Sequence, residues 1–145
     1  MASIFISGEI PEIGYDLLSD HQLEVYRGEK LITEEQLIAG VRNADALLCP
    51  LSTKVTRKVI EAAPHLKVIA NFGAGFDNID IEAAEERGIP VTNTPGVSTE
   101  ATAELTLGLM LALVRRIPEG DTLCRTTGFN GWAPLFFLGN ELPGK

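Results

Sequence analysis

The stretch Lys67–Asp80, KVIANFGAGFDNID, decides the fold of this chain. Its first residues, 67–71, form a short apolar run typical of a buried strand. Two glycines around an alanine follow, and Asp80 can then cap a helix that ends near Gly88. A strand, a tight turn and a capped helix form the repeating unit of parallel sheets with helices on both faces. We therefore expect an α/β fold in which the turn at residues 73–75 lies at the carboxyl end of a central strand.

The alternation of strand and helix continues outward on both sides of this stretch. The pattern predicts strands at 3–7, 23–27, 46–49, 67–71 and 90–93, and helices at 11–19, 34–42, 57–63, 81–87 and 99–116. Five strands favour a flavodoxin-like, doubly wound parallel sheet of order 2-1-3-4-5, in which Pro90 is tolerated on an edge strand. Thr33 and Gln36 form the pattern of a capping box at the start of the second helix.

The last fifth of the chain, after Pro118, has no such periodicity. Pro118 is expected to end the long helix. Residues 118–142 are rich in glycine and proline and contain an apolar cluster at 132–138. A long irregular arm of this kind must pack against something, either further protein or another subunit. The helix at 99–116 is apolar nearly all round, so it too must be buried.

Composition and charge narrow the class of protein. With 145 residues, 45% of them hydrophobic, the chain can bury the core of one domain with an appendage. A formal net charge of −8 repels polyphosphate, so nucleic acid is not an expected partner. The N-terminus lacks the pattern of a signal peptide, and no apolar stretch approaches the roughly 20 residues of a membrane span. We expect a cytoplasmic protein without a membrane partner.

The cysteines and histidines suggest no reactive constellation. Cys49 and Cys124 lie far apart in sequence, and neither has a histidine at metal-ligand spacing. We expect reduced, structural thiols and no metal site. His21 lies in a polar turn and His65 follows Pro64, so both are expected to be exposed and to play no part in catalysis.

The turn Gly73-Ala74-Gly75 is the strongest candidate site. Glycines on either side of a small residue can adopt positive φ, which lets successive backbone N–H groups converge on a carboxylate or a phosphate. The turn also resembles the start of the dinucleotide-binding pattern G-x-G-x-x-G, but Asn78 stands where the third glycine belongs. From these residues alone, a tight strand-to-helix turn without any ligand is the alternative interpretation.

Three motifs in fixed order give the chain a family resemblance. They are residues 71–80, the stretch GIPVTNTPG at 88–96 that runs on to STEATAEL at 98–105, and RRIP at 115–118. Together they resemble the N-terminal half of the D-isomer-specific 2-hydroxyacid dehydrogenases, in the branch of phosphoglycerate dehydrogenase and glyoxylate/hydroxypyruvate reductase. The resemblance extends through Gly131-Trp132 to residues 139–145. Leu105 follows Glu104 where formate dehydrogenases of the family carry a histidine, which argues against formate as the substrate.

The resemblance implies an oxidoreductase that transfers a hydride between NAD or NADP and a small D-2-hydroxy acid. Residues 1–98 would form a flavodoxin-like substrate-binding domain without its usual C-terminal helix. Residues 99–145 would form the first helix and the connecting arm of the NAD-binding domain, ending before its G-x-G-x-x-G. The arginine, the acidic residue and the histidine that catalyse the reaction in the family would lie beyond residue 145. This chain alone would then be inactive.

Matching positions imply the site residues. Gly73, Ala74 and Gly75 would hold the carboxylate of the 2-oxo or 2-hydroxy acid through backbone N–H groups, and Leu51 would form a wall of the site. Ala74 and Thr102 would lie near the NAD or NADP cofactor. Relatives pair through the long helix and the arm, which implies a homodimer through residues 99–117 and 118–142. A non-catalytic binding or dimerisation module is the alternative that stays open.

Overall fold

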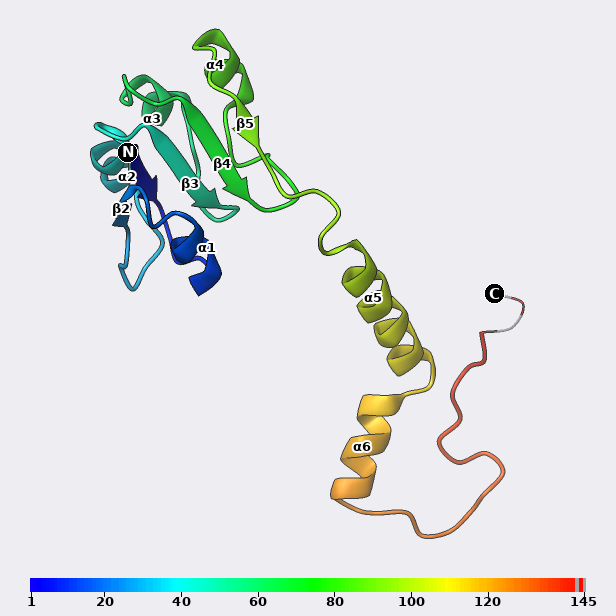
Figure 1. Ribbon diagram of the computed structural model, residues 1–145. Coiled ribbons are helices and arrows are strands. Elements are labelled where there is room, and N and C mark those ends of the chain that lie inside the picture. Colours follow the sequence, from blue (N-terminus) through cyan, green and yellow to red (C-terminus); the bar gives the residue numbers. More distant parts are fainter. Residues whose placement is uncertain (143, 145) are drawn as a thin grey trace. The chain divides into compact units, whose positions relative to one another are not determined.

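The structure is a computed structural model that describes residues 1–142 and 144 (Figure 1). Its elements, in chain order, are β1 (Ser3–Ile6), α1 (Glu12–Leu17), β2 (Gln22–Val25), α2 (Glu34–Val41), β3 (Ala46–Pro50), α3 (Arg57–Glu61), β4 (Val68–Phe72), α4 (Ile81–Glu86), β5 (Val91–Thr92), α5 (Thr99–Val114) and α6 (Ile117–Arg125). The chain divides into two compact units, Met1–Val97 and Ser98–Lys145. The first unit contains all of these strands. The family motif at 139–145 includes residues 143 and 145, which lie outside the described residues.

The strands form one parallel sheet of order β2-β1-β3-β4-β5, which confirms the predicted topology. β3 and β4 pair up to their last residues, with Pro50 opposite Phe72. Because parallel strands end at the same edge of a sheet, the loops after β3 and β4 begin side by side. β5 lies at the edge, directly after Pro90, whose carbonyl accepts a hydrogen bond from the Ile69 N–H at 3.0 Å.

The core of the first unit lies between the sheet and helices α2, α3 and α4. Alternate strand residues, including Phe5, Leu47 and Ile69, are buried in this cluster. The helices contribute their own apolar side chains, from Leu37, Val41, Val59, Ile60, Ala83 and Ala84. The apolar residues that alternate along the strands and those that recur with helical period along the helices therefore face the same core. This agreement is why the sequence predicts these elements.

The predicted helix caps are present. The Thr33 N–H donates to Oε1 of Gln36 at 3.0 Å, and the Gln36 N–H donates to Oγ1 of Thr33 at 3.3 Å, which completes the capping box of α2. The Asp80 carboxylate accepts a hydrogen bond from the Ala83 N–H at 2.9 Å at the start of α4. Gly88, just beyond α4, has a φ of 63°, the left-handed conformation that glycine adopts without strain.

The second unit departs from the prediction after residue 114. The long helix α5 stops at Val114, and the separate helix α6 occupies part of the segment for which the sequence predicts an irregular arm. The prediction for residues 118–125 is therefore wrong. Pro118 does not end a helix, because it lies in the first turn of α6, where the N–H that proline lacks has no partner to lose. Arg116 turns the chain between the two helices with a φ of 55°.

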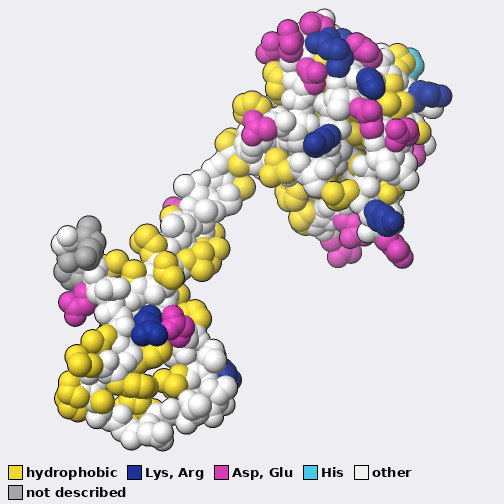
Figure 2. Space-filling model, turned by 180° about the vertical axis from the view of Figure 1, so that it is seen from behind, with side chains coloured by type: hydrophobic (Ala, Val, Ile, Leu, Met, Phe, Trp, Pro, Cys, Tyr) yellow, Lys and Arg dark blue, Asp and Glu magenta, His cyan; other side chains and the backbone are white. Residues whose placement is uncertain are grey.

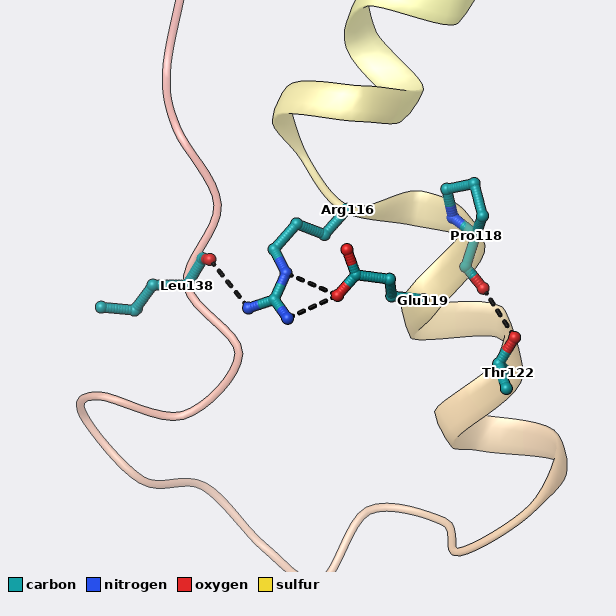
Figure 3. Close-up of polar contacts among 5 residues, drawn as sticks. All are labelled: Arg116, Pro118, Glu119, Thr122 and Leu138. Carbon is teal, nitrogen blue, oxygen red and sulfur yellow. Dashed lines mark hydrogen bonds and ion pairs between the residues drawn. The ribbon is translucent and has the colours of Figure 1, made fainter.

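Arg116 also ties the arm to the corner between α5 and α6 (Figure 3). Its Nε donates to Oε2 of Glu119 at 2.9 Å, and a second guanidinium nitrogen donates to the carbonyl of Leu138 at 3.4 Å. The guanidinium carbon lies 4.4 Å from the centroid of the Phe137 ring, a cation–π contact. A single side chain thus connects two helices to a segment more than 20 residues further along the chain.

The end of the arm meets the end of α5. The Asn140 N–H donates to the carbonyl of Val114 at 2.8 Å. A Cβ on Gly139 would lie 2.8 Å from the same carbonyl oxygen, so this close approach of two backbone segments requires a glycine. Residues 126–142 contain no helix or strand, as the sequence predicts for this part of the arm.

Large apolar side chains are exposed on both α5 and the arm. On α5 they are Leu105, Leu107, Leu109, Met110, Leu111 and Leu113, and on the arm they include Phe129, Trp132, Leu135 and Phe136. Figure 2 shows hydrophobic side chains on the surface of this unit. No helix in the described part of the chain is both long enough and apolar enough to cross a membrane.

Candidate functional site

The candidate site lies at the carboxyl edge of the sheet, where the loops after β3 and β4 meet. Leu51 directly follows β3, and Gly73, Ala74 and Gly75, which we call the glycine turn, directly follow β4. A Cβ on Gly73 would overlap the branched end of the Leu51 side chain. Because Gly73 has no side chain, the Leu51 side chain can pack over the turn. The Leu51 residue still has 50% of its surface exposed. The structure brings these predicted site residues together, and their role stays a prediction.

The backbone of the glycine turn has its carbonyl groups bonded and two of its N–H groups free. Each carbonyl accepts one hydrogen bond: that of Gly73 from the Thr94 N–H at 2.9 Å, that of Ala74 from Nδ2 of Asn93 at 2.7 Å, and that of Gly75 from Nδ2 of Asn71 at 2.7 Å. The Gly73 N–H donates to the Asn71 carbonyl at 3.0 Å. Within residues 1–142 and 144, the N–H groups of Ala74 and Gly75 donate to no acceptor. Both residues are exposed, as a backbone site for an anion from solvent requires.

The glycines do not shape this turn through positive φ. Neither Gly73 nor Gly75 adopts a positive φ, so the expectation of left-handed glycines in an anion nest is wrong. Hydrogen bonds to its three carbonyls hold the turn in place instead. The glycines supply space: Gly73 admits Leu51, and a Cβ on Gly75 would have no atom within 4 Å. The side of the turn at Gly75 is therefore open.

An asparagine pair that the sequence reasoning missed holds the turn in place. Asn71 is only 3% exposed, and its amide pairs reciprocally with that of Asn78 through hydrogen bonds of 3.2 and 3.1 Å. Nδ2 of Asn78 also donates to the carbonyl of Thr53 at 3.0 Å, in the loop after β3. Asn78 therefore replaces the expected third glycine with a residue that links the two loops. The one signal in the sequence is a polar residue, Asn71, inside an otherwise apolar strand.

The cysteines and histidines differ in their burial. Burial raises the pKa of the Cys49 thiol to about 12, and its Sγ lies 3.5 Å from Oδ1 of Asn71, so the thiol stays protonated beneath the asparagine pair. Cys124 is exposed, which contradicts a structural role in packing for this thiol. His21 and His65 are exposed, as predicted. Among residues 1–142 and 144, no group of three or more histidine, cysteine, aspartate or glutamate residues could hold a metal ion.

The remaining predicted site residue, Thr102, lies in the second unit. It is exposed in the first turns of α5, where its carbonyl accepts a hydrogen bond from Oγ1 of Thr106 at 2.7 Å. The sequence contains no complete G-x-G-x-x-G. The free N–H groups of the glycine turn suit one small anion rather than the extended pyrophosphate of a dinucleotide.

Known proteins match this chain along nearly its whole length. Residues 4–140 match the model of the D-isomer specific 2-hydroxyacid dehydrogenase catalytic domain. A Staphylococcus aureus protein, assigned provisionally as a 2-hydroxyacid dehydrogenase, is 58% identical over 146 residues, which cover 100% of this chain and 46% of that protein. The chain thus spans less than half the length of this relative.

Solved structures give the same result. The crystal structure of the TT0316 protein from Thermus thermophilus matches with a TM-score of 0.84 and 39% identity, over 94% of this chain and 44% of that one. The NADPH-dependent glyoxylate/hydroxypyruvate reductase from Sinorhizobium meliloti matches with a TM-score of 0.69 and 29% identity, over 86% of this chain and 39% of the reductase. Members of the matched family and solved relatives use NAD or NADP. With the predicted sheet order, the glycine turn and this match in place, the chain belongs to the D-isomer-specific 2-hydroxyacid dehydrogenase family.

Proposed function

We propose that this chain forms the substrate side of an oxidoreductase that transfers a hydride between NAD(P) and a small D-2-hydroxy acid. The acid is of the phosphoglycerate, glycerate/hydroxypyruvate or glyoxylate type. The observation that carries the proposal lies at the end of a central strand: the N–H groups of Ala74 and Gly75, two exposed residues, donate to no acceptor among residues 1–142 and 144. The similarity to the glyoxylate/hydroxypyruvate reductase of Sinorhizobium meliloti supports the glyoxylate and hydroxypyruvate part of this range.

In this proposal the glycine turn binds and orients the acid. The N–H groups of Ala74 and Gly75 donate to the carboxylate, and hydrogen bonds to a charged group contribute about 1.5–3 kcal/mol each. Leu51, half exposed beside Gly73, forms an apolar wall that excludes water from one side of the bound acid. The asparagine pair keeps the donors in place because it bonds the carbonyl of Gly75 and links it to the loop after β3. The residues that move the hydride and the proton are not among these.

The second unit takes the other part of the proposal. Residues 99–145 form the opening helix and arm of a nucleotide-binding domain, with Thr102 near the nicotinamide, and residues 1–98 form the substrate-binding domain. A homodimer pairs through the helix at 99–117 and the arm at 118–142. The exposed leucines of α5 support this pairing, since leaving a leucine-sized side chain in water costs about 1.5–3 kcal/mol relative to burial. A module that only dimerises would share this surface but would have no use for the free donors of the glycine turn.

Nuclear magnetic resonance of the ¹⁵N-labelled chain tests the carboxylate site. Titration with D-lactate should shift the amide resonances of Ala74 and Gly75 saturably, whereas D-lactamide, which has no carboxylate, should leave them in place. The same chain should show no saturable quenching or enhancement of NADH fluorescence, because the described residues lack a dinucleotide cradle. Equal shifts with lactate and lactamide, or no shift of either amide with lactate, would contradict the proposed function.

A further inference from the structure

The arm contains an asparagine followed by a glycine, Asn130-Gly131, a pair that occurs nowhere else in the sequence. Asparagine is among the thermolabile residues of proteins. The carbon of its side-chain amide reacts with the backbone nitrogen of the next residue, because the two close a five-membered ring. The reaction depends on the exposure of the asparagine, on a free N–H in the next residue and on the size of that residue's side chain.

Asn130 and Gly131 meet all of these conditions. Both residues are exposed, in a segment, residues 126–142, that contains no helix or strand. The Gly131 N–H donates to no acceptor within residues 1–142 and 144. Gly131 has no side chain to shield its backbone nitrogen, and a Cβ built on it would meet no atom within 4 Å. The nitrogen and the side-chain amide are therefore free to approach one another.

The other asparagines each lack at least one of these features. The residue that follows has an N–H bonded to a backbone carbonyl in three cases: Asn43, Asn78 and Asn93. Asn71 lies within β4 and is only 3% exposed. Asn140 is exposed, but its own N–H is bonded to Val114, and the side chain of Glu141 shields the nitrogen that would attack. The structure thus separates Asn130 from every other asparagine of the chain.

We propose that Asn130 is a site of spontaneous deamidation, which converts it to aspartate and isoaspartate. The backbone nitrogen of Gly131 forms a bond to Cγ of Asn130. The Cγ–Nδ2 bond breaks, and Nδ2 takes up the proton that the Gly131 nitrogen has lost and leaves as ammonia. Water then opens the succinimide ring: breaking the bond from nitrogen to Cγ gives aspartate, and breaking the bond from nitrogen to the backbone carbonyl carbon gives isoaspartate. The reaction consumes water and needs no oxidant or reductant.

The products change the charge and the backbone of the arm. Either acid adds one negative charge to the formal net charge of −8, and isoaspartate also lengthens the backbone by one carbon. In sequence the new carboxylate lies between Phe129 and Trp132, which are 58% and 82% exposed. An unpaired carboxylate is costly to take out of water, so the modified arm resists burial of these apolar neighbours. This inference goes beyond the proposed function and does not depend on it.

Mass spectrometry of the native chain, incubated at physiological temperature, tests the site. Trypsin cleaves after Arg125, and the peptide 126–145 carries both Asn130 and Asn140, so every sample contains its own control. The peptide should gain the mass of one amide-to-acid exchange at Asn130 before Asn140 changes. Fragmentation should show aspartate and isoaspartate together, the mark of a succinimide intermediate. A change at Asn140 before Asn130, or aspartate without isoaspartate, would overturn the proposal.

Unfolding and substitution give two further tests. In urea the hydrogen bonds after Asn43, Asn78 and Asn93 are lost, so these residues should begin to react, while Asn130 should keep its native rate. A native rate at Asn130 several-fold below its rate in urea would show that the arm shields it and would refute the inference. Asn130→Gln should abolish the early product, because glutamine would have to close a six-membered ring. Asn140→Gln is the matched control and should leave the rate at Asn130 unchanged.

Discussion

The exposed helix α5 makes the strongest prediction about this molecule in solution. Leu109 lies in the middle of α5 with 62% of its surface exposed. Leu109→Ala removes three carbons, each worth about 0.8 kcal/mol when fully buried. If a second copy covers the exposed share, the loss is about 1.5 kcal/mol per copy and about 3 kcal/mol per dimer, which raises the dimer dissociation constant roughly a hundredfold.

Sedimentation equilibrium over a range of micromolar concentrations measures this change directly. The wild-type chain should sediment as a dimer of its 15.6 kDa subunit, and Leu109→Ala should shift toward monomer in the same range. Leu17→Ala is the matched control, because Leu17 is 79% exposed on α1 and lies outside the proposed interface. A well-folded wild-type monomer, or equal dissociation constants for Leu109→Ala and wild type, would refute the reasoning.

Three further predictions concern single residues of the first unit and one thiol of the second. Gly75→Val should leave the melting temperature unchanged, because a Cβ added at Gly75 would meet no atom within 4 Å and the φ of Gly75 is not positive. The same substitution should abolish the lactate-induced shift of the Ala74 amide. Ellman's reagent at pH 8 should titrate one thiol in the native chain, that of Cys124, and two in guanidinium chloride, since burial raises the pKa of Cys49 to about 12; a fully reactive native Cys49 would count against this burial. Nζ of Lys67 donates to the Asp45 carboxylate at 2.7 Å, and this hydrogen bond lowers the pKa of Asp45. The pair therefore stabilises the fold fully at a pH above the ordinary pKa of aspartate. The stabilisation is lost as the pH falls through the lowered pKa. In urea unfolding, Asp45→Asn should be less stable than wild type at neutral pH and equal to it in strong acid; a gap that persists in acid would contradict the assignment.

The sheet of the first unit could be predicted because its signals are local. The period-2 strands, the capping box at Thr33 and the cap at Asp80 each depend on residues within a few positions of one another. Parallel order followed from the alternation of strands and helices, and the edge position of β5 followed from Pro90. Each of these local preferences agrees with the final packing, so the sequence pattern and the structure coincide.

The details of the second unit and of the glycine turn could not be predicted in the same way. A proline can follow the end of one helix or lie in the first turn of the next. For Pro118 the second arrangement holds, because Arg116 adopts a left-handed conformation and α6 begins directly after it. The asparagine pair joins residues seven positions apart whose amides meet only when β4 and the following loop are folded. The glycine turn has no positive φ, and its carbonyls accept hydrogen bonds from the side chains of Asn71 and Asn93. No local sequence pattern reveals which carbonyls these side chains bond.

The contacts of Arg116 and Asn140 have a consequence for how this protein can vary among species. The chain leaves the corner at the end of α5 and comes back to it, since Asn140 bonds Val114 and the Arg116 guanidinium bonds Leu138. The segment between these contacts is a closed loop whose two ends lie at the end of α5. Lengthening a closed loop is entropically cheap, about 0.6 kcal/mol for each doubling. Insertions and deletions between residues 126 and 135 should therefore be common among homologues. The close approach of Gly139 to the end of α5 should be conserved.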